Sequence, residues 1–165
     1  MMLRSIAAMV LLPALLLACS SAPPPPDWQM NAKSSLERGV TAYLSGNTRL
    51  EGLEFARART ELARTGRPDL LARAELTRCA ARVASLVFDD CPGFSALMQD
   101  APPAERAYAD YLAGKVTAQD AGLLPAPHRD AAASNGSADA LGRIKDPVAR
   151  LIAAGLPAER WHGER

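Results

Sequence analysis

The sequence predicts an all-α fold in which antiparallel helical hairpins stack around a central helix at about residues 68–88. Alanine, the residue with the highest helix propensity, is very common in the chain. Valine, isoleucine, threonine and tyrosine are scarce and do not alternate with polar residues, so strands have little support. Short turns separate the helical patterns, which places successive helices antiparallel to each other.

The chain begins with a segment that is typical of a secretory signal. Arg4 supplies a positive charge, and an apolar core of about a dozen residues runs from Ile6 to Leu17. This core is too short for a transmembrane helix, which needs roughly 20 apolar residues. It ends in the sequence Leu16-Leu17-Ala18-Cys19.

Residues 16–19 resemble the lipobox of bacterial lipoproteins. The resemblance implies diacylglyceryl transfer to the Cys19 thiol, removal of residues 1–18 and acylation (palmitate) of the new amine. Several acyl chains hold a protein at a membrane far better than one chain does. Because Ser20 rather than Asp follows Cys19, the resemblance also implies transfer to the outer membrane, with the domain facing the periplasm. The alternative is a plain signal peptide with an incidental cysteine.

Downstream of residue 18 we predict three parts: a lipidated, proline-rich tether at 19–28, one all-α domain at 29–161 and a loose tail at 162–165. Prolines 23–26 favour extended polyproline II, which lifts the domain off the lipid. We expect Trp28 to mark the point where the chain first contacts the domain. More broadly, the chain resembles the small uncharacterised helical lipoproteins of Gram-negative bacteria, a resemblance that implies no activity.

The first two helices are predicted at about 31–45 and 49–65, with the Gly46-Asn47 turn between them. The apolar residues of the second helix form two groups, Leu50 with Leu53, and Phe55 with Ala58 and Leu62. These groups point in different directions, so we expect this helix to contact neighbours on two sides.

From Gly39 through Ala58 the chain resembles one tetratricopeptide repeat. The positions that carry the resemblance are Gly39, the Gly46-Asn47 turn, Phe55 and Ala58. Glu51 stands where the family has alanine, and no clear second copy follows. The resemblance implies stacked helical hairpins.

The helix at about 68–88 is apolar around most of its circumference, and its charge lies mainly on Glu75, Arg78 and Arg82. A helix of this kind belongs in the middle of a core. After a turn at 89–93, shorter helices are predicted at about 94–99, 102–113, 118–123, 127–133 and 138–144. A last helix has Asp146 as its N-cap, Pro147 behind it, and ends at Gly155.

Cys79 and Cys91 are the two cysteines that remain once Cys19 is acylated. An even pair in an oxidising compartment indicates a disulfide, and the chain between them is just long enough to bring them together. Two buried thiols are the alternative. Cys-x-x-Cys, the spacing of thiol-exchange sites, does not occur.

No residue pattern predicts a metal or a cofactor. His128 and His162 are the two histidines, neither at metal-ligand spacing, and we expect both at the surface. A triad of His128, Ser134 and an aspartate lacks a Gly-x-Ser-x-Gly motif to support it. Glu54 and Glu75 have Arg57 and Arg78 at helical spacing, which would lower their pKa values rather than create the general acid of a peptidoglycan hydrolase.

Arginines are concentrated between residues 57 and 82. They either form the solvated edge of two helices or line a groove for an acidic ligand. The groove candidates are Tyr43, Phe55, Arg57, Arg59, Arg78 and Arg82.

The predicted function is therefore a non-enzymatic lipoprotein, held in the outer membrane through lipid at Cys19, that binds another envelope protein. Acidic and basic residues balance once the signal is removed, so we expect no nucleic-acid partner. The alternatives are a peptidoglycan hydrolase with scattered site residues and a peptidoglycan-binding spacer.

Overall fold

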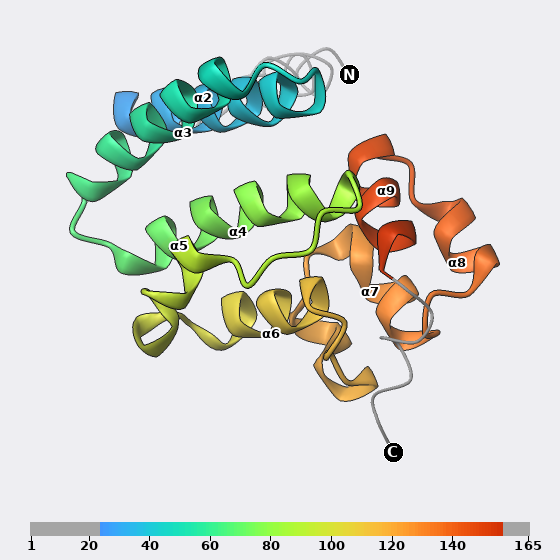
Figure 1. Cartoon of the computed structure of the whole chain (residues 1–165). Helices are drawn as coiled ribbons and strands as arrows, with labels where there is room; N and C mark the ends of the chain where they lie inside the picture. Colours follow the sequence, from blue (N-terminus) through green and yellow to red (C-terminus); the bar gives the residue numbers. More distant parts are fainter. Residues whose placement is uncertain (1–23, 157–165) are drawn as a thin grey trace, which may run out of the picture.

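The computed structural model describes residues 24–156, in which helices are joined by turns and loops and no strand occurs (Figure 1). This confirms the all-α class. The helices in chain order are α2 (Asp27–Leu44), α3 (Thr48–Ala63), α4 (Pro68–Ala84), α5 (Pro92–Ser95), η2 (Met98–Asp100), α6 (Pro103–Leu112), η3 (Ala118–Leu123), α7 (Ala126–Ala133), α8 (Ala138–Arg143) and α9 (Pro147–Gly155).

Helices α2 and α3 form an antiparallel hairpin that lies along one side of α4 (Figure 1). The turn between them uses Gly46 at φ 78°, and the Asn47 side chain caps α3 by accepting a hydrogen bond from the Leu50 amide. The two helices approach closely at Gly39, where an added Cβ would lie 2.9 Å from the Phe55 ring. The Phe55 ring fills the space that a side chain at position 39 would occupy.

Helix α2 begins at Asp27, four residues before the predicted start, because Pro26 serves as its N-cap. The helix therefore includes Trp28, which was placed in the predicted tether. Trp28 packs against a small apolar cluster whose buried members are Ala32, Leu62 and Ala74.

Helix α4 is the central element, with the hairpin on one side and the C-terminal helices on the other (Figure 1). It ends at Ala84, four residues before the predicted end. Leu86 adopts φ 60°, and the amides of Leu86 and Val87 donate back to the carbonyls of Val83 and Arg82. This is a Schellman termination in which leucine occupies the left-handed position that glycine usually takes.

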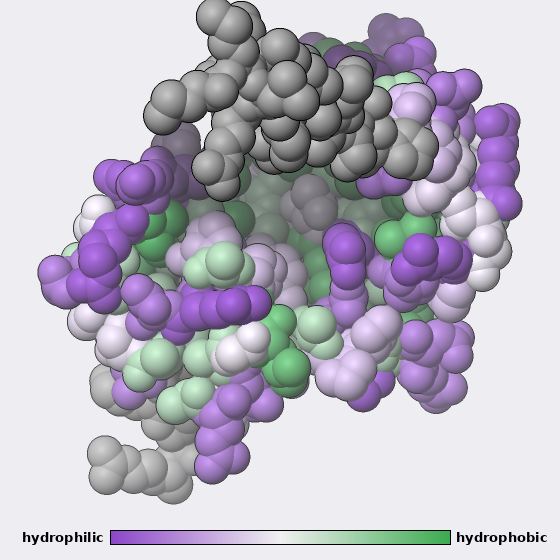
Figure 2. Space-filling model, turned by 180° about the vertical axis from the view of Figure 1, so that it is seen from behind, coloured by the Kyte–Doolittle hydropathy of each residue, from purple (hydrophilic) through white to green (hydrophobic). Residues whose placement is uncertain are grey.

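The main core lies between α4 and the helices that follow it. Its fully buried large side chains are Leu76, Phe94, Tyr111 and Leu124. Alanines of α6, α7 and α9 fill the space between them, which lets these helices pack closely. Seen from behind, apolar residues gather in a recess in the middle of the molecule and hydrophilic side chains surround them (Figure 2).

Two further expectations differ from the structure. Helix α3 does contact two neighbours, α2 and α4, but Leu50 and Leu53 are 39% and 51% exposed, so this apolar group is not covered by residues 24–156. In place of one helix at 94–99 there are two short segments, α5 and η2. Cys19 and His162 lie outside the described residues.

Candidate functional site

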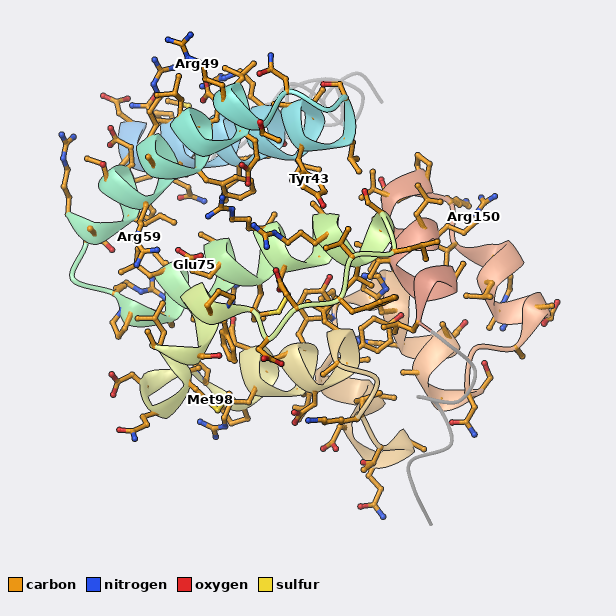
Figure 3. The ribbon with its side chains drawn as sticks, viewed as in Figure 1. Tyr43, Arg49, Arg59, Glu75, Met98 and Arg150 are labelled. Carbon is orange, nitrogen blue, oxygen red and sulfur yellow. A yellow bond between two sulfur atoms is a disulfide. The ribbon has the colours of Figure 1, made fainter. Side chains whose placement is uncertain are left out.

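Three of the groove candidates, Phe55, Arg59 and Arg78, take part in the contact between α3 and α4. Phe55 is 8% exposed, and the Arg78 guanidinium lies 5.4 Å from the centre of its ring. The Arg78 Nε donates to the Glu51 carboxylate at 2.6 Å. Arg59 donates to Glu75, which faces it from α4 (Figure 3). These residues join the hairpin to α4, so Phe55 is unavailable to a partner.

The other three groove candidates lie at the edges of this interface. Tyr43 is half-buried and extends from the end of α2 toward α4 (Figure 3). Arg82 donates to Asp89 in the turn after α4. Arg57 donates to Glu54 at 2.9 Å, the helical pair that the sequence predicts.

Glu54 is a buried carboxylate that sequence reasoning placed in solvent. It is 3% exposed and accepts hydrogen bonds from Arg38 of α2 and Arg57 of α3, both at 2.9 Å. The hydrogen bond from Arg38 lowers the pKa of Glu54, against the opposing effect of burial. Glu54 is therefore ionised at neutral pH and cannot serve as a general acid there.

Glu51 and Glu105 are also buried, each beside an arginine of α4. Glu51 accepts from Arg78, and Glu105 accepts from the Nε and Nη2 of Arg73 at 3.0 and 2.5 Å. Glu75 pairs with Arg59 of α3 and not with Arg78, because the antiparallel packing of α3 on α4 brings Arg59 to it. The arginines between residues 57 and 82 thus include several that join helices, beyond the solvated edge that the sequence suggested.

Cys79 and Cys91 are paired as a disulfide in the structure, with Cα atoms 5.6 Å apart. This is the cysteine pair that the sequence predicts. The bridge ties the turn after α4 back to the middle of that helix. Asp89 lies beside the two sulfur atoms, and the three residues could together offer metal ligands. Sulfur atoms bonded to each other are not thiolates, however, so the paired form does not provide the ligands that zinc prefers.

His128 lies in the interior, and the expectation of a surface position is wrong. It is 3% exposed, its Nδ1 is 3.2 Å from the Tyr111 hydroxyl, and its ring lies 5.5 Å from the Tyr108 ring, centre to centre. Burial lowers the pKa of His128 to about 4 and raises the pKa values of Tyr108 and Tyr111. All three groups are therefore neutral at pH 7.

The spacing of α7 explains why His128 is buried. His128, Ala131 and Ala132 stand at i, i+3 and i+4, so they share the face that packs on the core. The Ser134 hydroxyl donates to the Asp130 carbonyl at the surface, so the structure does not assemble the triad considered from the sequence.

A cleft of about 490 Å³ opens between α4, α6 and the start of α7. Its walls include Arg73 and Leu76 of α4, Glu105 and Tyr108 of α6, and Leu123 and Arg129 from the segment around η3 and α7. The size is in the range of small-molecule sites. Sequence reasoning missed the cleft because three segments far apart in the chain contribute to it.

Across residues 24–156, no helix combines the length and the apolar character needed to cross a bilayer. No family model matches the chain, and no curated protein and no solved structure is detectably similar to it.

Proposed function

We propose that the protein is a non-enzymatic lipoprotein, anchored in the outer membrane at Cys19, whose helical domain binds another envelope protein in the periplasm. The observation that carries the proposal is the outward side of α3. This helix has two groups of apolar residues: Phe55, Ala58 and Leu62 are buried against its neighbours in the described chain, whereas Leu50 and Leu53 are exposed. A partner protein would cover the side of α3 that carries Leu50 and Leu53.

The outward side of α3 has an apolar centre and a basic rim. Leu53 is 51% exposed, and Arg49 and Arg57 flank it at i−4 and i+4. Arg49 points away from α4 (Figure 3), and no carboxylate of residues 24–156 forms an ion pair with it. Such a face is complementary to an apolar contact surrounded by acidic residues.

The position of the tether supports this orientation. The chain enters α2 at Asp27, and the 18 residues of that helix extend about 27 Å to the hairpin turn. Leu50 lies just beyond that turn and Leu53 one helical turn further on. With a lipid at Cys19, Leu50 and Leu53 would therefore lie at the end of the hairpin that is farther from the point where the tether enters the domain. An oxidising periplasm would also maintain the Cys79–Cys91 pair.

The hydrolase alternative has less support. A glycosidase needs a carboxylic acid whose pKa is raised. The buried Glu51, Glu54 and Glu105 all form ion pairs with arginine, and the pKa of Glu54 is lowered.

The test is crosslinking in envelope membranes followed by purification of the tagged full chain. Leu53→Glu should lose the crosslinked partner, because it places an acid at the centre of a face that requires an apolar contact. Leu151→Glu is the matched control, since Leu151 is also 51% exposed but lies on α9, and it should keep the partner. Equal recovery from both variants would contradict the assignment to α3.

Anchoring is tested separately. Radiolabelled palmitate should enter the wild-type protein and not Cys19→Ser, and the mature N-terminus should be residue 19. Partners that crosslink equally well to both forms would count against anchored assembly, and absence of label from the wild type would contradict the lipid anchor.

A further inference from the structure

The cleft between α4, α6 and α7 is independent of α3 and of the proposed partner. We propose that it binds a carboxylate that is attached to an apolar group, such as the C-terminal residue of a peptide or a medium-chain fatty acid. The proposal rests on the charge balance of the cleft, on the fixed position of one guanidinium and on the apolar residues beside it, of which Leu123 and Pro125 are exposed.

The two arginines at the cleft differ in their partners. Arg73 donates twice to the buried Glu105 carboxylate, so these two charges offset each other. Arg129 also lines the cleft, but within residues 24–156 no carboxylate forms an ion pair with it. The described part of the cleft therefore carries one uncompensated positive charge, which matches a monoanion better than a doubly charged phosphate monoester.

Arg129 is held in place by the backbone. Its Nε donates to the carbonyl of Leu124 at 2.8 Å, five residues earlier in the chain. The guanidinium has five N–H donors, so this bond leaves its two terminal nitrogens available for a bidentate carboxylate. A guanidinium that is already oriented loses less conformational entropy on binding than a mobile side chain does.

The remaining wall is largely apolar. Its solvent-exposed part consists of Leu123, which is 45% exposed, and Pro125, next to the half-buried Tyr108 ring. Leu76 and Leu124 also line the cleft but are each only 1% exposed. An ion without an apolar body would leave this surface in water, whereas a short aliphatic chain or a leucine side chain would cover it. An arginine without a carboxylate partner among residues 24–156, next to apolar surface, selects the ligand class.

The test is a ¹H–¹⁵N NMR titration of the complete chain after the signal segment, residues 19–165, carrying Cys19→Ser. Octanoate and N-acetyl-leucyl-leucine are the probes, and octanamide and N-acetyl-leucyl-leucinamide are their neutral counterparts. At least one acid should shift the amide signals of residues 123–129 saturably, and its neutral counterpart should bind at least tenfold more weakly. The acid that binds more tightly identifies a fatty acid or a peptide terminus as the source.

Two variants localise the effect. Arg129→Gln should weaken binding of the acid at least tenfold. Arg150→Gln is the matched control and should bind as the parent protein does, because Arg150 also donates to a preceding backbone carbonyl, that of Ile144, and also lacks a carboxylate partner in the described chain. Leu123→Asp should abolish binding by placing a negative charge in the apolar wall.

Three results would overturn the proposal. They are the absence of a saturable shift with both acids, equal affinity for an acid and its amide, and equal losses from Arg129→Gln and Arg150→Gln. Because the substitutions are at exposed positions, each variant should retain the dispersed spectrum of the parent, which separates lost binding from lost folding.

Discussion

Ion pairs and one cation–π contact join the α2–α3 hairpin to α4. On the other side of the same helix, α6, α7 and α9 are joined to it mainly by a continuous apolar core, with the Arg73–Glu105 ion pair at its edge. On the hairpin side the apolar cluster that includes residues of α2, α3 and α4 is small, and its buried members are Ala32, Leu62 and Ala74. On the core side, Leu76, Tyr111 and Leu124 are all at most 1% exposed.

This difference predicts that the two sides respond to different perturbations. Burial of apolar surface stabilises a fold without regard to charge, at roughly 25 cal/mol per Å². Ion pairs near the surface depend on pH and ionic strength and contribute less each. We therefore expect the core to supply most of the stability and the hairpin to be the more easily detached part. The hairpin also carries the face that we propose for partner binding.

The largest expected effect is on the core side. Leu76→Ala should lower the free energy of unfolding by about 2–5 kcal/mol, because Leu76 is 1% exposed and its loss leaves a cavity. Leu53→Ala, on the outward side of the hairpin, should change it by less than about 0.5 kcal/mol. Urea denaturation of both variants measures the difference, and equal losses would contradict the comparison.

The second prediction uses one glycine from each side. A Cβ on Gly155 would lie 2.7 Å from the backbone carbonyl oxygen of Val83, which cannot move without displacing α4. Gly155→Ala should therefore cost about 1–3 kcal/mol. A Cβ on Gly39 would instead meet the Phe55 ring, which can shift.

Gly39→Ala also gains up to about 1 kcal/mol of helix propensity, so its net effect should lie within about 1 kcal/mol of zero. Thermal unfolding of the two variants tests the pair. A greater loss of stability from Gly39→Ala than from Gly155→Ala would show that α2 and α3 pack more rigidly against each other than α9 packs against α4.

Much of the fold could be predicted from local signals. Asp146 caps α9, Pro147 follows it, and the helix ends at Gly155, as the sequence predicts. The end of α4 could not be predicted, because Leu86 occupies a position where sequence rules expect glycine. The backbone hydrogen bonds from Leu86 and Val87 to α4 accompany that conformation, although Leu86 itself is 67% exposed.

The candidate sites were less predictable. Helical spacing predicted the Glu54–Arg57 pair, and sequence separation predicted the approach of Cys79 and Cys91. Neither of these signals could identify the partner of Glu75 or the cleft at Arg129, because both depend on which helices become neighbours. His128 had a detectable signal in its spacing from Ala131 and Ala132, but two alanines do not distinguish a core face from an exposed one.

The third prediction concerns acid stability of the core side. The pKa of His128 is lowered to about 4 in the folded protein, whereas unfolded histidine has a pKa of about 6.5. Below pH 6.5 the unfolded state therefore binds a proton that the folded state does not, and stability falls as the pH falls. Between pH 7 and 5 this linkage costs about 2 kcal/mol.

The groups around His128 do not offset this loss. Tyr108 and Tyr111 are neutral there, and Asp146 raises the pKa of His128 less than burial lowers it. Unfolding free energies at pH 7, 6 and 5 should fall in the wild type and in His162→Gln, and stay nearly level in His128→Gln. A fall that persists in His128→Gln would assign the acid sensitivity elsewhere. Glu54, whose pKa is lowered, loses its contribution only at lower pH, as its carboxylate becomes protonated.

The smallest expected effect is on the charged interface. Glu51→Gln keeps the shape of the side chain but replaces a charged acceptor for Arg78 with a neutral one, which should cost about 1 kcal/mol. Glu61→Gln is the control, because its contact with Arg64 at 3.4 Å lies on the exposed side of α3 and should contribute less than about 0.5 kcal/mol.

The effect of salt then separates the two sides of α4. If ion pairs hold the hairpin, the difference between Glu51→Gln and the wild type should shrink in 1 M NaCl, where the screening length falls to about 3 Å. The loss from Leu76→Ala should not shrink, because no charge is involved in it. A Glu51→Gln loss as large as that of Leu76→Ala and insensitive to salt would mean that the charged interface is as integral to folding as the apolar core.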